Sequence, residues 1–165
     1  MQFILNFKLT IPFKIFELIL SQNIKVNFSI PDWQDVWILI KSGITVFRKV
    51  KNQYIEDQMF GMLMSSLELV TKKVFDGDLT TFSVGTIQFV LYQRNNFIFV
   101  GSFSKKVKEK KALKELEFIA EKFFETYSSE LLNNILTNWG GNIEVFSNFS
   151  KILEESPEVK FKDLF

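Results

Sequence analysis

Hydrophobic and polar positions along this chain follow two periods, that of a β-strand and that of an α-helix. Residues 35–50 predict two strands around a tight turn at Lys41-Ser42-Gly43, where Gly43 supplies the positive φ that such a turn often needs. Three further strands are expected at residues 79–85, 86–93 and 97–104. Because the connections between these three are short, we expect them to pair as an antiparallel meander.

Two segments between and after the strands carry the helical period. Residues 56–75 predict an amphipathic helix, with acidic residues at its start and lysines near its end, as the helix dipole favours. Its expected core stripe is Phe60, Leu63, Met64, Leu67, Val70 and Val74. Residues 108–136 predict one long helix. Its apolar side is formed by Leu113, Leu116, Ile119, Ala120, Phe123, Phe124 and Tyr127.

The two ends of the chain are less regular. Residues 1–30 predict an N-terminal extension, with a short helix that starts at Pro12 and a strand that ends before Pro31. At the other end, the break Trp139-Gly140-Gly141 stops the long helix, and a short alternating segment leads into a last helical turn over residues 150–155. We therefore expect a main domain over residues 31–155 and a polar C-terminal tail over residues 156–165.

The order of these elements predicts the fold class. It is an α+β, two-layer fold with a five-stranded antiparallel sheet in the order β-β-α-β-β-β-α-α, preceded by the extra N-terminal segment. Two amphipathic helices can supply the covered face that such a sheet needs.

Composition excludes several kinds of chemistry. The 165-residue chain has no cysteine and no histidine, so it offers no thiolate nucleophile, no imidazole base and no sulfur-based zinc site. Only 7 glycines are present and no glycine-rich phosphate loop is found, which argues against a nucleotide-dependent enzyme. The net charge of +1 argues against a general nucleic-acid binder. We therefore expect a non-catalytic protein without a cofactor or metal, whose work is binding.

The closing segment also supports a resemblance to a known fold. Its elements are Trp139 and Gly140, Ile143 to Phe146, Asn148-Phe149, Lys151, and Ile152-Leu153-Glu154-Glu155. Together with the element order and the first hairpin, this segment resembles the longin fold of the small chains of clathrin-type adaptors, and roadblock domains are close structural relatives. The resemblance covers roughly residues 33–155 and implies that the last helix folds back on the sheet with Phe149 and Leu153 buried.

The resemblance implies a dimerising platform in a cytoplasmic assembly, with a small GTPase or a membrane-trafficking or coat-like complex as the partner. In related folds the first helix and the neighbouring central strand, here residues 79–85, often meet partners. The candidate interface residues are Met59, Met62, Leu69, Thr80, Phe82 and Val84. For the methionines the alternative stays open that the helix is simply buried on a wide face.

A second interpretation is recruitment to the surface of a membrane. Its candidate residues are Phe13, Phe16, Ile19 and Leu20 in the N-terminal helix, and Lys105, Lys106, Lys108, Lys110 and Lys111 in a basic cluster. The alternatives are that the apolar helix packs on its own sheet and that the lysines form a solvated loop entering a helix. Glu115, Glu117 and Glu121 are expected on the solvated face of the long helix, not at a catalytic site.

Overall fold

The computed structural model describes residues 27–29, 31–50, 56–138, 142–155 and 158–160. The chain divides into a larger unit, Pro31–Ser156, and a smaller unit that combines Met1–Ile30 with Pro157–Phe165. In the smaller unit, β1 (Asn27–Ser29) pairs with β7 (Glu158–Lys160) in antiparallel fashion. The sequence pattern predicted a strand that includes β1, but only a polar tail where β7 lies.

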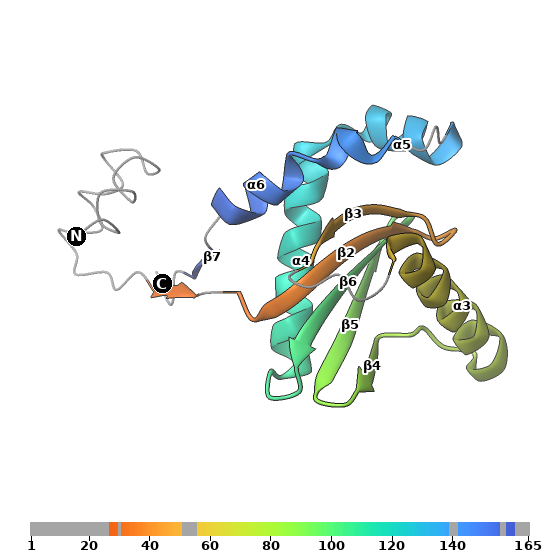
Figure 1. Ribbon diagram of the computed structural model, residues 1–165, viewed down its shortest axis with the longest axis vertical. Helices are drawn as coiled ribbons and strands as arrows, with labels where there is room; N and C mark the ends of the chain where they lie inside the picture. Colours follow the sequence, from red (N-terminus) through yellow and green to blue (C-terminus); the bar gives the residue numbers. More distant parts are fainter. Residues whose placement is uncertain (1–26, 30, 51–55, 139–141, 156–157, 161–165) are drawn as a thin grey trace. The chain divides into compact units, whose positions relative to one another are not determined.

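A five-stranded antiparallel sheet forms the frame of the larger unit (Figure 1). Its strands are β2 (Trp33–Ile40), β3 (Thr45–Lys49), β4 (Thr81–Val84), β5 (Ile87–Arg94) and β6 (Phe97–Ser104). The hairpin turn between β2 and β3 contains Gly43 with a φ of 92°, as expected. The predicted class, an α+β fold with this element order, is confirmed.

The strand order is β3-β2-β6-β5-β4, so the segment expected to be the central strand is an edge strand. The middle position belongs to β6, which is buried from Phe97 to Phe103. Its nearly continuous apolar run suits a strand that is covered on both faces, whereas β4 is short and partly polar. That expectation about residues 79–85 was therefore wrong.

Helices cover both faces of the sheet (Figure 1). One face is covered by α3 (Asp57–Phe75), and the other by α4 (Glu109–Thr126), α5 (Ser129–Thr137), the 3-10 helix η1 (Ile143–Phe146) and α6 (Phe149–Glu155). Alternation along β2 shows the two sides, because Ile38 and Ile40 join the core under α4 while Leu39 joins the core under α3. The two amphipathic helices thus lie on opposite faces, which differs from the expected single covered face.

The predicted long helix is in fact two helices. Tyr127 has extended backbone angles after α4, and Ser128 begins α5 by accepting a hydrogen bond on its side chain from the backbone N–H of Leu131. A serine at this position satisfies an N–H that the first helical turn would leave without a partner. The helical period alone gives no sign of this break, because apolar residues continue at helical spacing on both sides of it.

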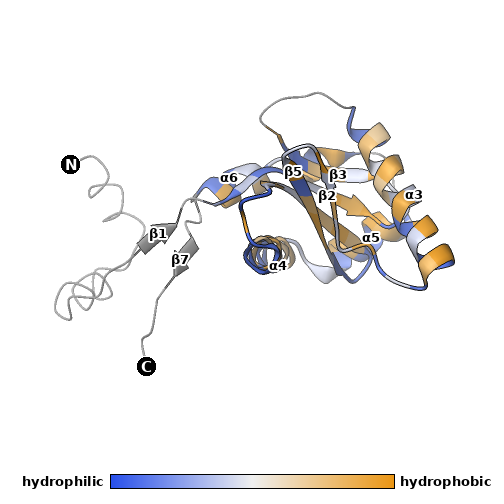
Figure 2. Cartoon of the chain, turned by 90° about the horizontal axis from the view of Figure 1, so that it is seen from below, coloured by the Kyte–Doolittle hydropathy of each residue, from blue (hydrophilic) through white to orange (hydrophobic). Residues whose placement is uncertain are grey.

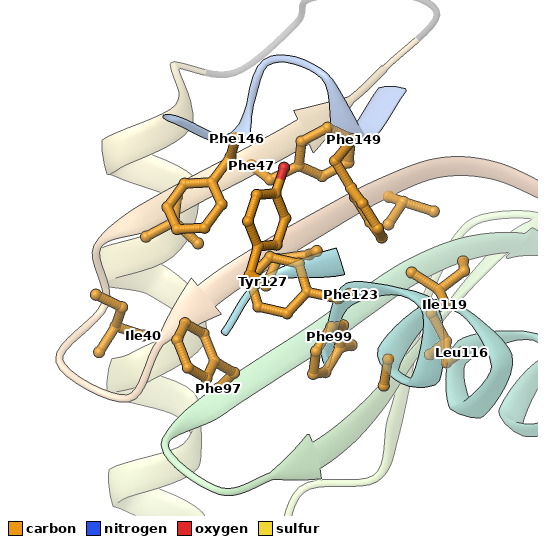
Figure 3. Close-up of a cluster of buried hydrophobic side chains, with 14 of the residues drawn as sticks. Ile40, Phe47, Phe97, Phe99, Leu116, Ile119, Phe123, Tyr127, Phe146 and Phe149 are labelled. Atoms are coloured by element: carbon orange, nitrogen blue, oxygen red, sulfur yellow. The ribbon is translucent and has the colours of Figure 1, made fainter. Parts of the chain in front are cut away.

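The core under α4 is built largely from aromatic rings (Figure 3). Phe123 lies at its centre, with ring centroids 5.1 to 5.7 Å from those of six other rings. These rings belong to Phe97, Phe99, Phe124, Tyr127, Phe146 and Phe149. The closing segment therefore contributes to the core as expected, with Phe149 fully buried and Leu153 half-buried.

A β-bulge lies near the start of β2. Its register against β6 shifts between Trp33 and Asp35. The shift changes which side of the sheet a given position faces. Trp33 consequently packs with the core under α4, and Trp37 packs with the core under α3.

Candidate interaction surface

The first half of α3 is fixed to the β2–β3 hairpin by close polar and backbone contacts. A Cβ atom added at Gly61 would lie 2.0 Å from the carbonyl oxygen of Gly43, so the helix and the turn approach as closely as backbone allows. Thr45 Oγ1 donates a hydrogen bond of 2.7 Å to the carbonyl oxygen of Asp57. Arg48 forms a 2.8 Å ion pair with the Asp57 carboxylate. These contacts set the rotation of α3 about its own axis.

That rotation differs from the one predicted by the apolar stripe. Phe60 and Met64 are buried as expected, but Leu63, Val70 and Val74 are 48%, 52% and 65% exposed. The physical reason is the close contact between Gly43 and Gly61. It turns the side of the helix that carries Phe60, Gly61 and Glu68 towards the sheet. The core expectation for Leu63, Val70 and Val74 was wrong.

The side of α3 that faces away from the sheet is strongly apolar. Met59, Met62 and Leu69, predicted as interface residues, are 61%, 66% and 54% exposed. Together with the residues displaced from the expected core and with Phe75, they form what we call the α3 surface: Met59, Met62, Leu63, Leu69, Val70, Val74 and Phe75. Figure 2 shows hydrophobic residues along nearly the whole length of this helix. Contiguous apolar surface of this kind is typical of a contact site.

The edge strand β4 continues the chain after α3. Thr80, just before β4, is exposed, Phe82 is half-buried and Val84 is 64% exposed. In the described part of the chain β4 pairs only with β5, which leaves its outer edge open to another strand. We call the α3 surface together with Phe82, Val84 and this open edge the α3–β4 surface.

A row of aromatic rings runs across the sheet between the two parts of this surface. Phe82 stacks on Phe89 at 4.7 Å, Phe89 lies 6.2 Å from Trp37, and Trp37 stacks on Phe60 of α3 at 4.3 Å. Phe82, Phe89 and Trp37 are each only partly buried. Neither Phe89 nor Trp37 was expected at an interface from the sequence pattern. The signal for Phe89 was its register opposite Phe82 across the β4–β5 turn.

A small charge network borders the end of α3. Glu68 is 6% exposed and its carboxylate forms a 2.7 Å ion pair with Lys72. The hydrogen bond and the charge of Glu68 raise the pKa of Lys72, and Asp78 at 3.5 Å adds to the effect. Lys72 therefore stays charged. The exposed apolar residues of α3 cover more of this surface than the charge network does.

The residues predicted for membrane contact divide into two groups. Phe13, Phe16, Ile19 and Leu20 lie outside the described residues. The lysines of the basic cluster, Lys105, Lys106, Lys108, Lys110 and Lys111, are exposed on the turn after β6 and the first turn of α4. Lys111 pairs with the carboxylate of Asp32.

Glu115 lies close to this cluster and is buried, in contrast to the expectation from the sequence. It is 3% exposed, and its Oε2 accepts hydrogen bonds from the backbone N–H groups of Asp32 at 2.9 Å and Trp33 at 3.3 Å. A carboxylate can be buried when it satisfies backbone donors in this way. Glu121 is exposed, as expected, and Glu117 is half-buried.

A catalytic or metal centre is not evident in the described ranges. There, no group of three or more acidic side chains, the only such ligands this chain has, is placed to hold a metal ion. Within the same ranges, none of the helices combines the length and hydrophobicity required to span a bilayer.

Comparison with known proteins gives a likeness of fold. No family model matches the sequence, and no curated protein matches it either. MglB of Myxococcus xanthus is similar in structure, with 12% sequence identity, a TM-score of 0.46, and coverage of 58% of this chain and 85% of that one. The gliding protein MglB of Thermus thermophilus has 9% identity and a TM-score of 0.40, covering 52% of this chain and 70% of its own.

A roadblock/LC7 domain of Streptomyces avermitilis is also similar. It has 8% identity and a TM-score of 0.42, with 56% of this chain and 87% of that domain covered. A roadblock domain is thus among the similar solved structures.

Proposed function

We propose that this chain is a non-catalytic interaction module that forms a dimer through the α3–β4 surface and so builds a platform for a protein partner. The observation that carries this proposal is the exposed apolar side of α3 beside an open strand edge. A helix that is apolar around most of its circumference, yet covered on one side only, gains stability when a second surface covers it.

The size of the surface suits a stable contact. The exposed large apolar residues of α3 and Val84 are 48% to 75% accessible. At roughly 150–200 Å² for a side chain of this size, they present about 800 Å², which is close to the area that each partner buries in a standard interface.

The charges and the open edge favour a second copy of the chain as the first partner. Glu56 and Asp57 lie at the start of α3, and Lys72 and Lys73 lie in its last turn. Two copies of this helix packed antiparallel would place acidic residues opposite basic ones. Antiparallel pairing of two β4 strands would at the same time satisfy their outer backbone groups.

The class of the further partner follows from the resemblance of the closing segment and the fold, not from the α3–β4 surface. Longin and roadblock domains generally act as dimerising platforms, often for small GTPases, so we propose a small GTPase or a subunit of a trafficking or coat-like complex as the partner. The expected place of this assembly is the cytoplasm.

The dimer is tested by mass measurement in solution. The variants Met62→Asp and Phe82→Asp place a charge on α3 and next to the β4 edge, whereas Ile143→Asp places one on η1, at a residue that is 47% exposed outside the α3–β4 surface. Analytical ultracentrifugation should show a dimer for the parent chain and Ile143→Asp, and monomers for the two surface variants. The proposal is wrong if the surface variants, folded by circular dichroism, dimerise like the parent.

The partner is tested separately by a pull-down from lysate with and without a non-hydrolysable GTP analogue. A small GTPase retained in one nucleotide state by the parent, and by Ile143→Asp, would support the platform. Recovery of coat-like subunits in both states would favour a structural subunit of such a complex. A dimer that retains neither class would leave the contact surface intact but contradict the proposed partner.

A further inference from the structure

A second surface, unrelated to α3, is marked by positive charge. It consists of Lys105, Lys106, Lys108, Lys110 and Lys114, which we call the lysine end because it lies on the turn after β6 and the first turns of α4. All five side chains belong to exposed residues. The β4–β5 turn lies next to it, since the backbone N–H of Lys105 donates a 3.0 Å hydrogen bond to the carbonyl oxygen of Thr86.

The charges of the lysine end are not balanced within the described part of the molecule. Lys49, Lys72 and Lys122 each pair with a carboxylate, and Lys111 pairs with Asp32. The five lysines of the lysine end have no such ion pair among the described residues. Residues 105–114 hold six lysines and one glutamate, a charge of +5, so a chain with a total of +1 carries −4 elsewhere.

This placement of lysines opposes the local preferences of the fold. The N-terminus of a helix carries partial positive charge and favours an acidic or hydroxyl-bearing residue. Helix α5 follows the rule with Ser128 and Glu130, and α3 begins with Asp57. Helix α4 also begins with an acidic residue, Glu109, but Lys108 precedes it and Lys110 and Lys111 follow it in the first turn. Positive charge gathered where the fold disfavours it is stabilised when an anionic surface binds there.

The chemistry of the cluster indicates what that surface is. Every basic residue in it is lysine, whose ammonium group is a flexible point charge, while arginine would supply the planar donor fork that recognises single carboxylates or phosphates. Flexible point charges on an exposed turn are suited to the diffuse negative potential at the surface of an anionic lipid membrane.

We infer that the lysine end binds the anionic surface of a lipid membrane. The contact is electrostatic and reversible, because a single basic cluster without a lipid anchor gives only weak attachment. It is weakened by salt, which screens exposed charges. This inference is independent of the dimer, because none of the five lysines belongs to the α3–β4 surface.

The test is sedimentation of the full chain with vesicles. Vesicles of phosphatidylcholine alone are compared with vesicles of an equal mixture of phosphatidylcholine and phosphatidylserine, at low and high salt. The parent should bind the mixed vesicles, should lose that binding at high salt, and should stay in solution with the neutral ones. Equal binding to both kinds of vesicle would overturn the inference, because it would place the affinity in an apolar segment.

Matched variants locate the contact. Lys105→Gln/Lys106→Gln removes two charges from the turn, and the control Lys41→Gln/Lys151→Gln removes two exposed lysines elsewhere. Each lysine near an anionic surface changes the partition coefficient about fivefold, so the first pair should lower it about twenty-five-fold. The control should stay close to the parent. Equal losses in both pairs would show an effect of net charge alone and contradict the inference.

The rival polyanions are tested in the same assay. Polyglutamate and a DNA duplex are added in place of vesicles. The parent, the Lys105→Gln/Lys106→Gln variant and the control variant are again compared at low and at high salt. Binding of either polymer that depends on Lys105 and Lys106, without binding to the mixed vesicles, would overturn the membrane inference in favour of an acidic polypeptide or a nucleic acid.

Discussion

The two faces of the five-stranded sheet are covered to very different extents. Under α4, α5, η1 and α6, the core contains six of the largest fully buried side chains of the described residues, all of them phenylalanines. Under α3, the buried cluster is smaller, and Trp37, Phe82 and Phe89 pack at its margin with part of their surface in solvent. Among the described residues, one face of this sheet is therefore fully covered and the other is covered only in part.

The difference separates residues that stabilise the fold from residues that are proposed to bind a partner. A side chain that is already buried contributes to folding, and an exposed apolar side chain is still able to contribute to association. The face under α4 serves the first purpose. The α3 side, with one helix held along a narrow line, leaves most of its apolar residues exposed, and the proposed dimer would bury them.

The largest expected effect compares one phenylalanine from each face. Phe123→Ala removes a ring that is 0% exposed and should lower the free energy of unfolding by about 3–5 kcal/mol. Phe82→Ala removes a half-buried ring stacked mainly on Phe89 and should cost about 1 kcal/mol. Urea unfolding measures both. Similar losses for the two variants would contradict the asymmetry between the faces.

The next effect isolates the attachment of α3. In Gly61→Ala the new Cβ would lie 2.0 Å from the Gly43 carbonyl oxygen, so α3 must move away from the hairpin. We expect a loss of about 2–3 kcal/mol, although alanine is the better helix former by about 1 kcal/mol. Gly77→Ala, whose new Cβ would meet only an atom at 3.8 Å, should change stability by less than about 0.5 kcal/mol.

Hydrogen exchange shows which face of the sheet is destabilised by Gly61→Ala. Amide protection in Gly61→Ala should fall along α3 and stay close to the parent along α4, because the two helices pack on opposite faces. Equal loss along both helices would mean that the faces unfold as one unit, and would remove the basis for treating α3 separately.

The smallest effect concerns a polar atom in the core under α4. Burial raises the pKa of the Tyr127 hydroxyl above 10.0, and this hydroxyl has no hydrogen-bond partner among the described residues. A raised pKa in the folded state gives stability that is complete below the pKa of the unfolded chain and is lost as pH rises through the folded value. The parent should therefore lose stability above about pH 10.

Removal of the Tyr127 hydroxyl should remove the part of the stability loss at alkaline pH that this group causes. At neutral pH, Tyr127→Phe should leave the free energy of unfolding unchanged or raise it by up to about 1 kcal/mol, since an unpaired buried hydroxyl disappears. Thermal unfolding at neutral and alkaline pH measures both quantities, with Tyr92→Phe as the control for loss of a tyrosine. An alkaline loss of the same size in Tyr127→Phe would show that other groups cause it.

The sheet and the helix order were predictable from the sequence because strands and helices repeat at fixed periods. The rotation of α3 was not, because it depends on the contact of Gly61 with Gly43, two residues with no side chain to enter an apolar pattern. Leu63 and Val70 therefore moved from the expected core to the surface. The position of β4 at the edge was not predictable either. It depends on which strands pair with each other, and the local pattern of residues does not contain that information.

The buried carboxylate of Glu115 shows a second limit. Its place on α4 looks polar from the sequence, but the backbone N–H groups that it satisfies belong to Asp32 and Trp33, more than eighty residues away. Met59, Met62 and Leu69, the candidate interface residues on α3, are exposed for a simpler reason. They lie beside the expected stripe, so a modest rotation of the helix left them in solvent.

The β-bulge at the start of β2 has an optical consequence. Trp33 and Trp37 are four residues apart, yet the register shift between Trp33 and Asp35 places their indoles on opposite faces of one sheet. With Trp139 changed to phenylalanine, the remaining tryptophan fluorescence would come from these two rings alone. Trp37, stacked on Phe60, would report contacts made at α3, while Trp33 would serve as an internal reference within the same molecule.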